Sequence, residues 1–261
     1  MTAPQQNIDW SLIRTLAELS AKAYGQSTAT DAATAASALV VADGGDIYVA
    51  FQGSKAPRDF LQDGKFKLVP LVYLRHQSSQ PCTAEVHHGF LEDFDALCDK
   101  VVVQVRNWLD VMPKARIYIT GHSLGGGIAI LCAFVMARQN FPLVRVITFG
   151  QPRVGNAAFK KLYNQKVVEN FGCAGIRLEE ITFHVVNADD PVPLLPPLLN
   201  GYRDEGNEIF LPRTPGYLVN PSIGLQLFDD VMGCFDSWRR GKLAFIPNHF
   251  IAAYQERIKD L

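Results

Sequence analysis

The chain has 261 residues, of which 48% are hydrophobic and 20% are charged, a length that allows one sizeable core and is short for two. Its 25 Lys and Arg residues nearly balance its 26 Asp and Glu residues, which leaves a formal net charge of -1 and no basic field to attract nucleic acid. We therefore expect one globular domain over residues 1–261, and no apolar run reaches the roughly 18 residues that a transmembrane helix requires.

The N-terminal part of the chain is predicted to form a helix and a hairpin. Residues 1–10 contain no basic residue and no apolar stretch of signal-peptide length, so we expect no signal peptide in this sequence. Two locations of the protein stay open: the cytoplasm, or outside the cell after removal of a signal peptide. Apolar residues recur at helical spacing over residues 8–23. Two β-rich runs at 38–42 and 46–51 flank an Asp-Gly-Gly turn at 43–45, which predicts a hairpin.

The rest of the chain alternates between predicted strands and predicted helices. The strands are predicted at residues 117–120, 144–149, 181–186 and 208–211. The helices are predicted at residues 90–111, 124–138, 157–170, 225–238 and 249–259. This alternation predicts an α/β fold with a mostly parallel central sheet and helices on both of its faces.

A G-x-S-x-G element, Gly121 to Gly125, lies between the predicted strand at 117–120 and the helix predicted from Leu124. In such a turn the serine, here Ser123, has strained backbone angles and an exposed oxygen, and the glycines let the two backbones pass closely. The helix dipole would favour negative charge that develops beside Ser123. The alternative is a glycine-rich helix start with a capping serine, although glycines there destabilise a helix. We therefore predict that Ser123 is the nucleophile of a serine hydrolase.

In a serine hydrolase with this type of turn, the acid, Asp or Glu, follows the serine in the chain, and the base, His, follows the acid. Only His184 and His249 come after Ser123, and His184 lies within a predicted apolar strand, which is a poor place for a mobile imidazole. His249 is therefore the predicted base. Asp189 and Asp190 follow the same strand, at the edge where sites of α/β sheets assemble. We predict Asp190 as the acid, because the proline after it favours an extended conformation, and Asp189 is the alternative.

The five cysteines are odd in number and widely spaced, and none of them forms a C-x-x-C pair. We expect buried free thiols such as Cys132, one disulfide at most, and no metal site. Nucleophilic catalysis by serine uses protein side chains, so we expect no cofactor.

These motifs resemble those of the class 3 lipases of the α/β-hydrolase fold, a family typified by fungal triacylglycerol lipases and related feruloyl esterases. The matching segments are Y-V-A-F-Q-G-S at 48–54, H-G-F at 88–90, T-G-H-S-L-G-G at 120–126, F-G-Q-P-R-V-G-N at 149–156, V-N-A-D-D-P-V-P-L-L-P-P at 186–197 and N-H-F at 248–250. The combination of G-H-S-L-G-G with G-x-P-R-V-G-N is highly specific. The resemblance implies hydrolysis of carboxylic esters through an acyl-enzyme.

The resemblance also implies an oxyanion hole. In that family the hydroxyl residue after F-x-G is one donor, here Ser54, and the backbone N–H after the nucleophile is the other, here that of Leu124. Two fixed donors aimed at a tetrahedral oxyanion are each worth about ten- to a thousandfold in rate. The family's acid and base fall on Asp190 and His249, in agreement with the choices above. The sequence departs from the common F-R-G-[ST] pattern because it carries Gln52.

The loop after Ser54, residues 55–66, corresponds to the lid of that family. Phe60 and Leu61 would lie on one face of a short amphipathic helix and would meet lipid or an acyl chain when the lid opens. Phe60 also replaces the tryptophan often found in the lid. The alternative interpretation is a fixed surface helix.

A second apolar segment follows the predicted acid. Prolines keep this segment from forming an α-helix. Its leucines are predicted to line an acyl groove: Leu194, Leu195, Leu198 and Leu199. The alternative is an ordinary packed loop.

The leading hypothesis is a triacylglycerol lipase, which would bind its lipid or ester substrate at a lipid–water interface. A feruloyl or short-chain carboxylesterase is the second hypothesis, because the predicted lid is more polar than a strongly interfacial lipase needs. A hydrolase-like binding module without activity is the third, and the presence of all three triad residue types in the required order argues against it. Acyl-chain length, regioselectivity and oligomeric state are left open by the sequence.

Overall fold

The computed structural model describes residues 8–54, 66–71, 83–168, 175–188, 190–221 and 247–261. The helices are α1 (Trp10–Lys22), α3 (His88–Val111), α4 (Leu124–Arg138), α5 (Ala157–Gln165), α6 (Leu178–Ile181) and α8 (Ile251–Ile258), with 3-10 turns η2 (Val192–Leu194), η3 (Leu198–Asn200) and η4 (Pro247–His249). The strands are β1 (Ala29–Thr30), β2 (Ser37–Asp43), β3 (Asp46–Phe51), β4 (Leu68–Pro70), β5 (Glu85–His87), β6 (Arg116–His122), β7 (Leu143–Phe149), β8 (Gly155–Asn156), β9 (Val167–Val168), β10 (Ile176–Arg177), β11 (Thr182–Asn187), β12 (Tyr202–Arg203), β13 (Asn207–Leu211) and β14 (Leu218–Val219).

Eight of these strands form one sheet, in the order β1-β2-β3-β6-β7-β11-β13-β14. Neighbouring strands are parallel from β3 through to β13, whereas β1, β2 and β14 run antiparallel to their neighbours at the two edges. Parallel neighbours need crossover connections, and α3 and α4 provide two of them, between β3 and β6 and between β6 and β7. The predicted α/β-hydrolase type of sheet is confirmed.

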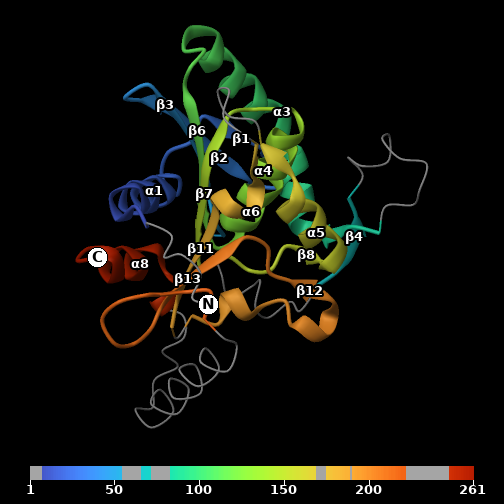
Figure 1. Ribbon diagram of the computed structural model, residues 1–261. Helices are drawn as coiled ribbons and strands as arrows, with labels where there is room; N and C mark the ends of the chain where they lie inside the picture. Colours follow the sequence, from blue (N-terminus) through green and yellow to red (C-terminus); the bar gives the residue numbers. More distant parts are fainter. Residues whose placement is uncertain (1–7, 55–65, 72–82, 169–174, 189, 222–246) are drawn as a thin grey trace.

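Helices cover both faces of this sheet, with α1 and α8 on one face and α3, α4 and α5 on the other (Figure 1). Strand β6 illustrates why, because successive side chains of a strand point to opposite faces. Ile117 and Ile119 belong to the apolar cluster that includes α3 and α4, whereas Tyr118 belongs to the cluster that includes α1 and α8. In α4 every residue from Gly125 to Ala137 is buried. Helix α4 is therefore firmly packed on all sides and supports Ser123, the residue that precedes it.

The N-terminal hairpin forms as predicted. Strands β2 and β3 pair antiparallel, with Asp43 opposite Asp46. Gly44 and Gly45 between them have positive φ values of 58° and 87°. Glycine enters this backbone region without a steric penalty, so the two glycines determine where the chain reverses.

The short strands were not predicted. Strands β4, β5, β8 and β12 form a second sheet, in the order β12-β8-β5-β4. Each has only two or three residues, which is too few for an alternating pattern to show in the sequence.

Several predicted helices differ at their ends, and α3 begins at His88 instead of 90. Helix α5 ends at Gln165 instead of 170, because Lys166 adopts an extended conformation. The last helix begins at Ile251 instead of 249, because η4 ends on His249. His249 thus stands outside the helix. The helix predicted at 225–238 lies outside the described residues.

Cys98 and Cys132 are free and buried, as expected of small apolar side chains. The other three cysteines lie outside the described residues: Cys82, Cys173 and Cys234. Across the described part of the chain, no helix is both long and apolar enough to cross a membrane.

Candidate active site

Ser123 stands on the sharp turn between β6 and α4. Its backbone has φ 58° and ψ -129°, a conformation that a non-glycine residue adopts only where its surroundings enforce it. Close backbone approach enforces it here: a Cβ at Gly121 would lie 2.2 Å from the Gly125 oxygen, and a Cβ at Gly125 would lie 2.3 Å from the Phe51 oxygen. The turn therefore has the strained geometry that the two glycines predict.

The two predicted oxyanion donors belong to neighbouring elements. Leu124 is the first residue of α4, where backbone N–H groups have no acceptor within the helix. Ser54 follows β3, which pairs in parallel with β6 so that Phe51 lies beside Gly121. Ser54 and Ser123 therefore lie beyond the same edge of the sheet.

Gln52, the departure from the family pattern, is anchored to β2. Its backbone N–H donates to the backbone oxygen of Ser37 over 3.0 Å, and its side-chain oxygen accepts from the Ser37 hydroxyl. The segment that leads into Ser54 is thus attached to the neighbouring strand by two hydrogen bonds.

The structure brings Ser123, His249 and Asp190 together although they are far apart in the chain. His249 Nε2 lies 2.7 Å from Ser123 Oγ, and His249 Nδ1 lies 2.8 Å from Asp190 Oδ2. All three side chains are buried. The second oxygen of Asp190 accepts from the backbone N–H of Val192 over 2.9 Å, so the turn after the acid fixes its direction. The alternative acid, Asp189, lies outside the described residues.

Two further residues complete this cluster, and sequence reasoning missed both. The Tyr254 hydroxyl on α8 donates to Asp190 Oδ2 over 2.5 Å and accepts from the backbone N–H of Asn187 over 3.3 Å. Gly150 has φ 56°, and a Cβ there would lie 2.8 Å from Asp190 Oδ2 and 3.1 Å from His249 Nδ1. Only glycine leaves room for the acid and the base at this point. The position of Gly150 in the F-G-Q-P-R motif was the signal in the sequence that could have identified it.

His184, the other histidine after Ser123, is held within the sheet. Its Nδ1 lies 2.9 Å from the Thr148 hydroxyl, and its Nε2 donates to the backbone oxygen of Glu205. Burial lowers the pKa of this imidazole, which favours its neutral form. The structure therefore does not bring His184 to Ser123.

The sequence pattern of the family described as Lipase (class 3) matches residues 48–200, more than half of the chain. The chain belongs to the class 3 lipases. Among curated relatives, it is 33% identical over 130 residues to secreted mono- and diacylglycerol lipase 1 of Fusarium solani, which covers 50% of this chain and 35% of that protein. It is 32% identical over 169 residues to a lipase of Rhizomucor miehei, which covers 63% of this chain and 41% of that protein. The chain thus spans less than half the length of these relatives.

Solved structures agree with this membership. A triacylglycerol lipase described as having a serine protease triad at its catalytic centre superposes with a TM-score of 0.66 and 25% identity, over 84% of this chain and 85% of that one. A lipase of Rhizopus microsporus var. chinensis superposes with a TM-score of 0.68 at 23% identity, over 85% and 80% of the two chains, and supports the fold alone.

In this class 3 lipase, the arginine of the G-x-P-R motif holds the loop after the predicted acid. The Arg153 guanidinium donates to the backbone oxygens of Leu194 and Pro196 and pairs with Asp204 over 3.0 Å. Its backbone N–H donates to the Leu195 oxygen over 2.7 Å. The proline-rich segment forms only the short turns η2 and η3, so its carbonyl groups depend on such outside donors.

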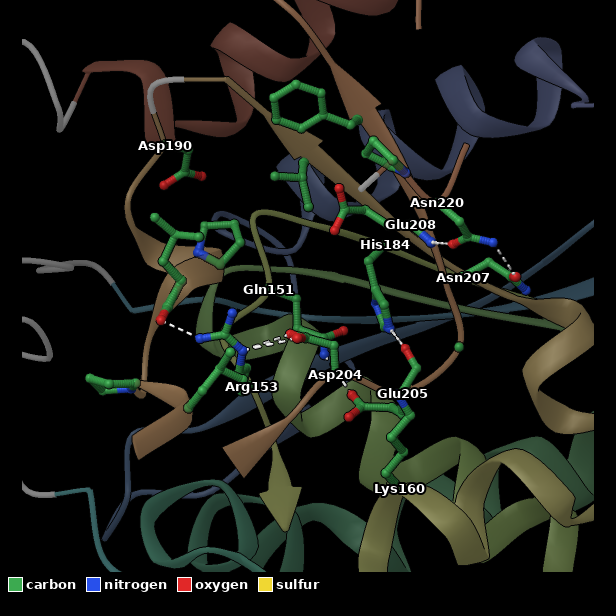
Figure 2. A pocket seen from close by; sticks show the side chains of 18 of the residues that line it. Gln151, Arg153, Lys160, His184, Asp190, Asp204, Glu205, Asn207, Glu208 and Asn220 are labelled. Atoms are coloured by element: carbon green, nitrogen blue, oxygen red, sulfur yellow. Dashed lines mark hydrogen bonds and ion pairs between the residues drawn. The ribbon is translucent and has the colours of Figure 1, made fainter. Parts of the chain in front are cut away.

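A cavity of about 490 Å³ lies beside the acid (Figure 2). Its lining includes three of the four leucines predicted to line an acyl groove, Leu194, Leu198 and Leu199, whereas Leu195 does not line it. The lining also includes polar residues: Gln151, Arg153, Lys160, His184, Asp204 and Glu205. Of the described residues, Asp190 lines the cavity but Ser123 and His249 do not. The leucines thus line a real cavity, while its use for an acyl chain stays a prediction.

The predicted lid residues Phe60 and Leu61 lie outside the described residues, together with residues 55–65 as a whole. Phe66, at the end of the predicted loop, is described and half-buried.

Proposed function

We propose that the protein is a serine carboxylic-ester hydrolase that acts on acylglycerols through an acyl-enzyme. The observation that carries this proposal is the continuous set of hydrogen bonds from Ser123 through His249 to Asp190. The competing interpretation of Ser123 as a helix cap has no support, because its side chain makes no capping hydrogen bond to α4, which is described throughout.

The hydrogen bonds support the following first half of the proposed reaction. Asp190 accepts a hydrogen bond from the Nδ1–H group of His249, which leaves Nε2 as an acceptor for the Ser123 proton. As Ser123 Oγ forms a bond to the ester carbonyl carbon, its proton passes to Nε2, and the imidazolium is stabilised by the carboxylate. The bond to the alcohol then breaks, the alcohol takes the proton from Nε2, and the acyl group stays on Oγ.

The second half of the reaction repeats the steps with water. Water attacks the acyl carbon and gives a proton to Nε2, and Oγ leaves with that proton, which restores Ser123 and neutral His249. In both halves the carbonyl oxygen becomes negative. The proposed donors to it are the N–H of Leu124 and Ser54, and the N-terminal end of α4 adds a favourable dipole.

The substrate class is proposed from two kinds of support. One relative named above is a mono- and diacylglycerol lipase, one of the solved structures is a triacylglycerol lipase, and Leu194 and Leu198 line the cavity that Asp190 also lines. We also propose that the protein contacts a lipid–water interface through Phe60 and Leu61. A feruloyl or short-chain esterase is the competing enzyme.

Ser123→Ala tests the proposal. It should lower kcat by a factor of about a thousand or more on soluble nitrophenyl esters, because the attacking oxygen is lost, while Ser11→Ala on the exposed side of α1 should have no effect. A serine-directed phosphonate should label the wild type and not the Ser123→Ala variant. Turnover that rises with acyl length and on emulsified triglyceride would support a lipase, and turnover confined to short or feruloyl esters would select the esterase. No labelling and no turnover would indicate a binding module.

A further inference from the structure

Tyr24 lies just beyond α1 and contacts the nucleophile turn, which is the sharp turn around Ser123 between β6 and α4. Its hydroxyl is 2.7 Å from Nδ1 of His122, the residue before Ser123. On the other side of the same ring, Nε2 of His122 is 2.5 Å from the backbone oxygen of His249. One imidazole ring therefore joins the end of the first helix to the backbone of the proposed base.

The direction of both hydrogen bonds follows from the partners. A carbonyl oxygen only accepts, so Nε2 of His122 carries a proton and donates it to His249. His122 is 1% exposed, and burial, followed by the neighbouring His249 ring, lowers its pKa to about 3. The ring is then neutral, Nδ1 is an acceptor, and the Tyr24 hydroxyl is its donor. Burial raises the pKa of Tyr24, which keeps this phenol protonated.

His249 is thus held at two points. Asp190 binds Nδ1 of its ring, and His122 binds its backbone oxygen. The centres of the two imidazole rings are 4.7 Å apart. A positive charge on His122 would oppose the imidazolium that forms on His249 during the reaction, and a neutral His122 avoids this repulsion.

Tyr24 also contacts the segment that leads to the proposed oxyanion donor. A Cβ at Gly53 would lie 2.2 Å from the Tyr24 hydroxyl and 2.5 Å from the backbone oxygen of His122. The phenol therefore packs directly against the backbone before Ser54. One side chain touches the donor segment and, through His122, supports the base.

We propose that Tyr24 and His122 are positioning residues that hold the base loop and the oxyanion-donor segment against the nucleophile turn. The inference rests on the ester hydrolysis proposed above. His122 contacts the backbone of His249, and Tyr24 contacts His122 and the Gly53 segment, so the effect of both residues on the reaction is indirect. Small displacements of a base or a donor lower the rate of the chemical step more than they weaken substrate binding.

The test compares Tyr24→Phe with Tyr163→Phe, since each removes one hydrogen-bonded phenolic oxygen. Tyr163 bonds Thr182 over 2.8 Å and packs in the cluster that includes α3 and α4, away from the site. With active sites counted by phosphonate labelling, Tyr24→Phe should lower kcat on a soluble short-chain ester about tenfold at unchanged KM. Tyr163→Phe should leave kcat unchanged, even if both variants lose stability. An unchanged kcat in Tyr24→Phe, or equal losses in both variants, would overturn the proposal.

Variants of His122 distinguish the effect of its hydrogen bond to His249 from the effect of the space that its side chain fills. His122→Gln keeps an N–H close to the place of Nε2, and His122→Leu keeps none, so the Gln variant should retain about tenfold more kcat. Equal rates in the two would also overturn the proposal, and if His122→Leu fails to fold, Tyr24→Phe decides. Ser123→Ala is measured beside them. An inactive wild type would refute the proposed function, whereas an active wild type with an inactive Ser123→Ala and an unaffected Tyr24→Phe would refute this inference alone.

Discussion

Two buried carboxyl groups on neighbouring loops differ in their hydrogen-bond donors. Asp190 accepts from the imidazole of the proposed base, from the Tyr254 hydroxyl and from the backbone N–H of Val192. Glu205 accepts at Oε1 from the Gln151 amide over 2.8 Å, and its Oε2 has no partner among the described residues. Hydrogen bonds to a carboxylate favour its charged form, whereas burial with few donors favours the protonated acid.

The environment of Glu205 changes its protonation state. Burial, followed by the charge of Asp204, raises the pKa of Glu205 to about 8, so this group is protonated at neutral pH. Asp190 is equally buried, but it is surrounded by N–H and O–H groups that suit a carboxylate. Burial alone therefore does not prepare a carboxyl group to stabilise an imidazolium, and the surrounding donors do.

Removal of the acid's charge should have the largest effect. Asp190→Asn keeps the shape of the side chain but favours the wrong tautomer of His249, so kcat should fall about ten-thousandfold. The matched control is Asp189→Asn, for which a loss of less than about tenfold is expected. The measurement is steady-state kcat on a soluble ester, and the reverse ranking would transfer the role of acid to Asp189.

Glu205→Gln should change the pH dependence of stability while kcat stays close to that of the wild type. The folded state holds a proton on Glu205 that the unfolded chain releases, because the pKa is raised from 4.5 to about 8. Stability from this group is therefore full below about pH 4.5 and is lost as pH rises to about 8, by up to about 1.4 kcal/mol for each pH unit.

Urea unfolding at several pH values would measure this effect. The variant should lose less stability than the wild type between pH 5 and pH 8 on the scale just given. The exposed Glu18→Gln serves as the control and should follow the wild type. Parallel curves for Glu205→Gln and the wild type would show that Glu205 is ionised in the folded protein.

Tyr254→Phe should lower kcat much less than Asp190→Asn. It removes one of the donors to Asp190 and leaves the acid and the base in place, so kcat should fall about tenfold. Tyr202→Phe is the control, because the buried Tyr202 hydroxyl has no partner in the described part of the protein, and its removal should not lower kcat. If both variants keep full activity, the contrast between the two carboxyl groups does not depend on Tyr254.

Several features of the fold and the site could be predicted because they depend on neighbours in the chain. The strained turn at Ser123 needs glycine at nearby positions, and the hairpin at 43–45 needs residues that accept a positive φ. The choice of His249 followed from chain order and from the apolar strand around His184. The ends of α5 and α8 were missed, and so were the short strands, which have too few residues for a pattern and can pair with distant segments, as β12 pairs with β8.

The sequence by itself determined the α/β architecture, the strained turn at Ser123 and the candidates for acid and base, because glycine sterics and side-chain periodicity act locally. Only the tertiary structure decided which side chains surround them. Asp190 is contacted by Tyr254 and Gly150, and the turn at Ser123 is contacted by Tyr24. These partners are far apart in the chain, and no local pattern encodes such contacts. The protonated state of Glu205 likewise depends on burial and on the number of donors within reach, both of which exist only once the chain has folded.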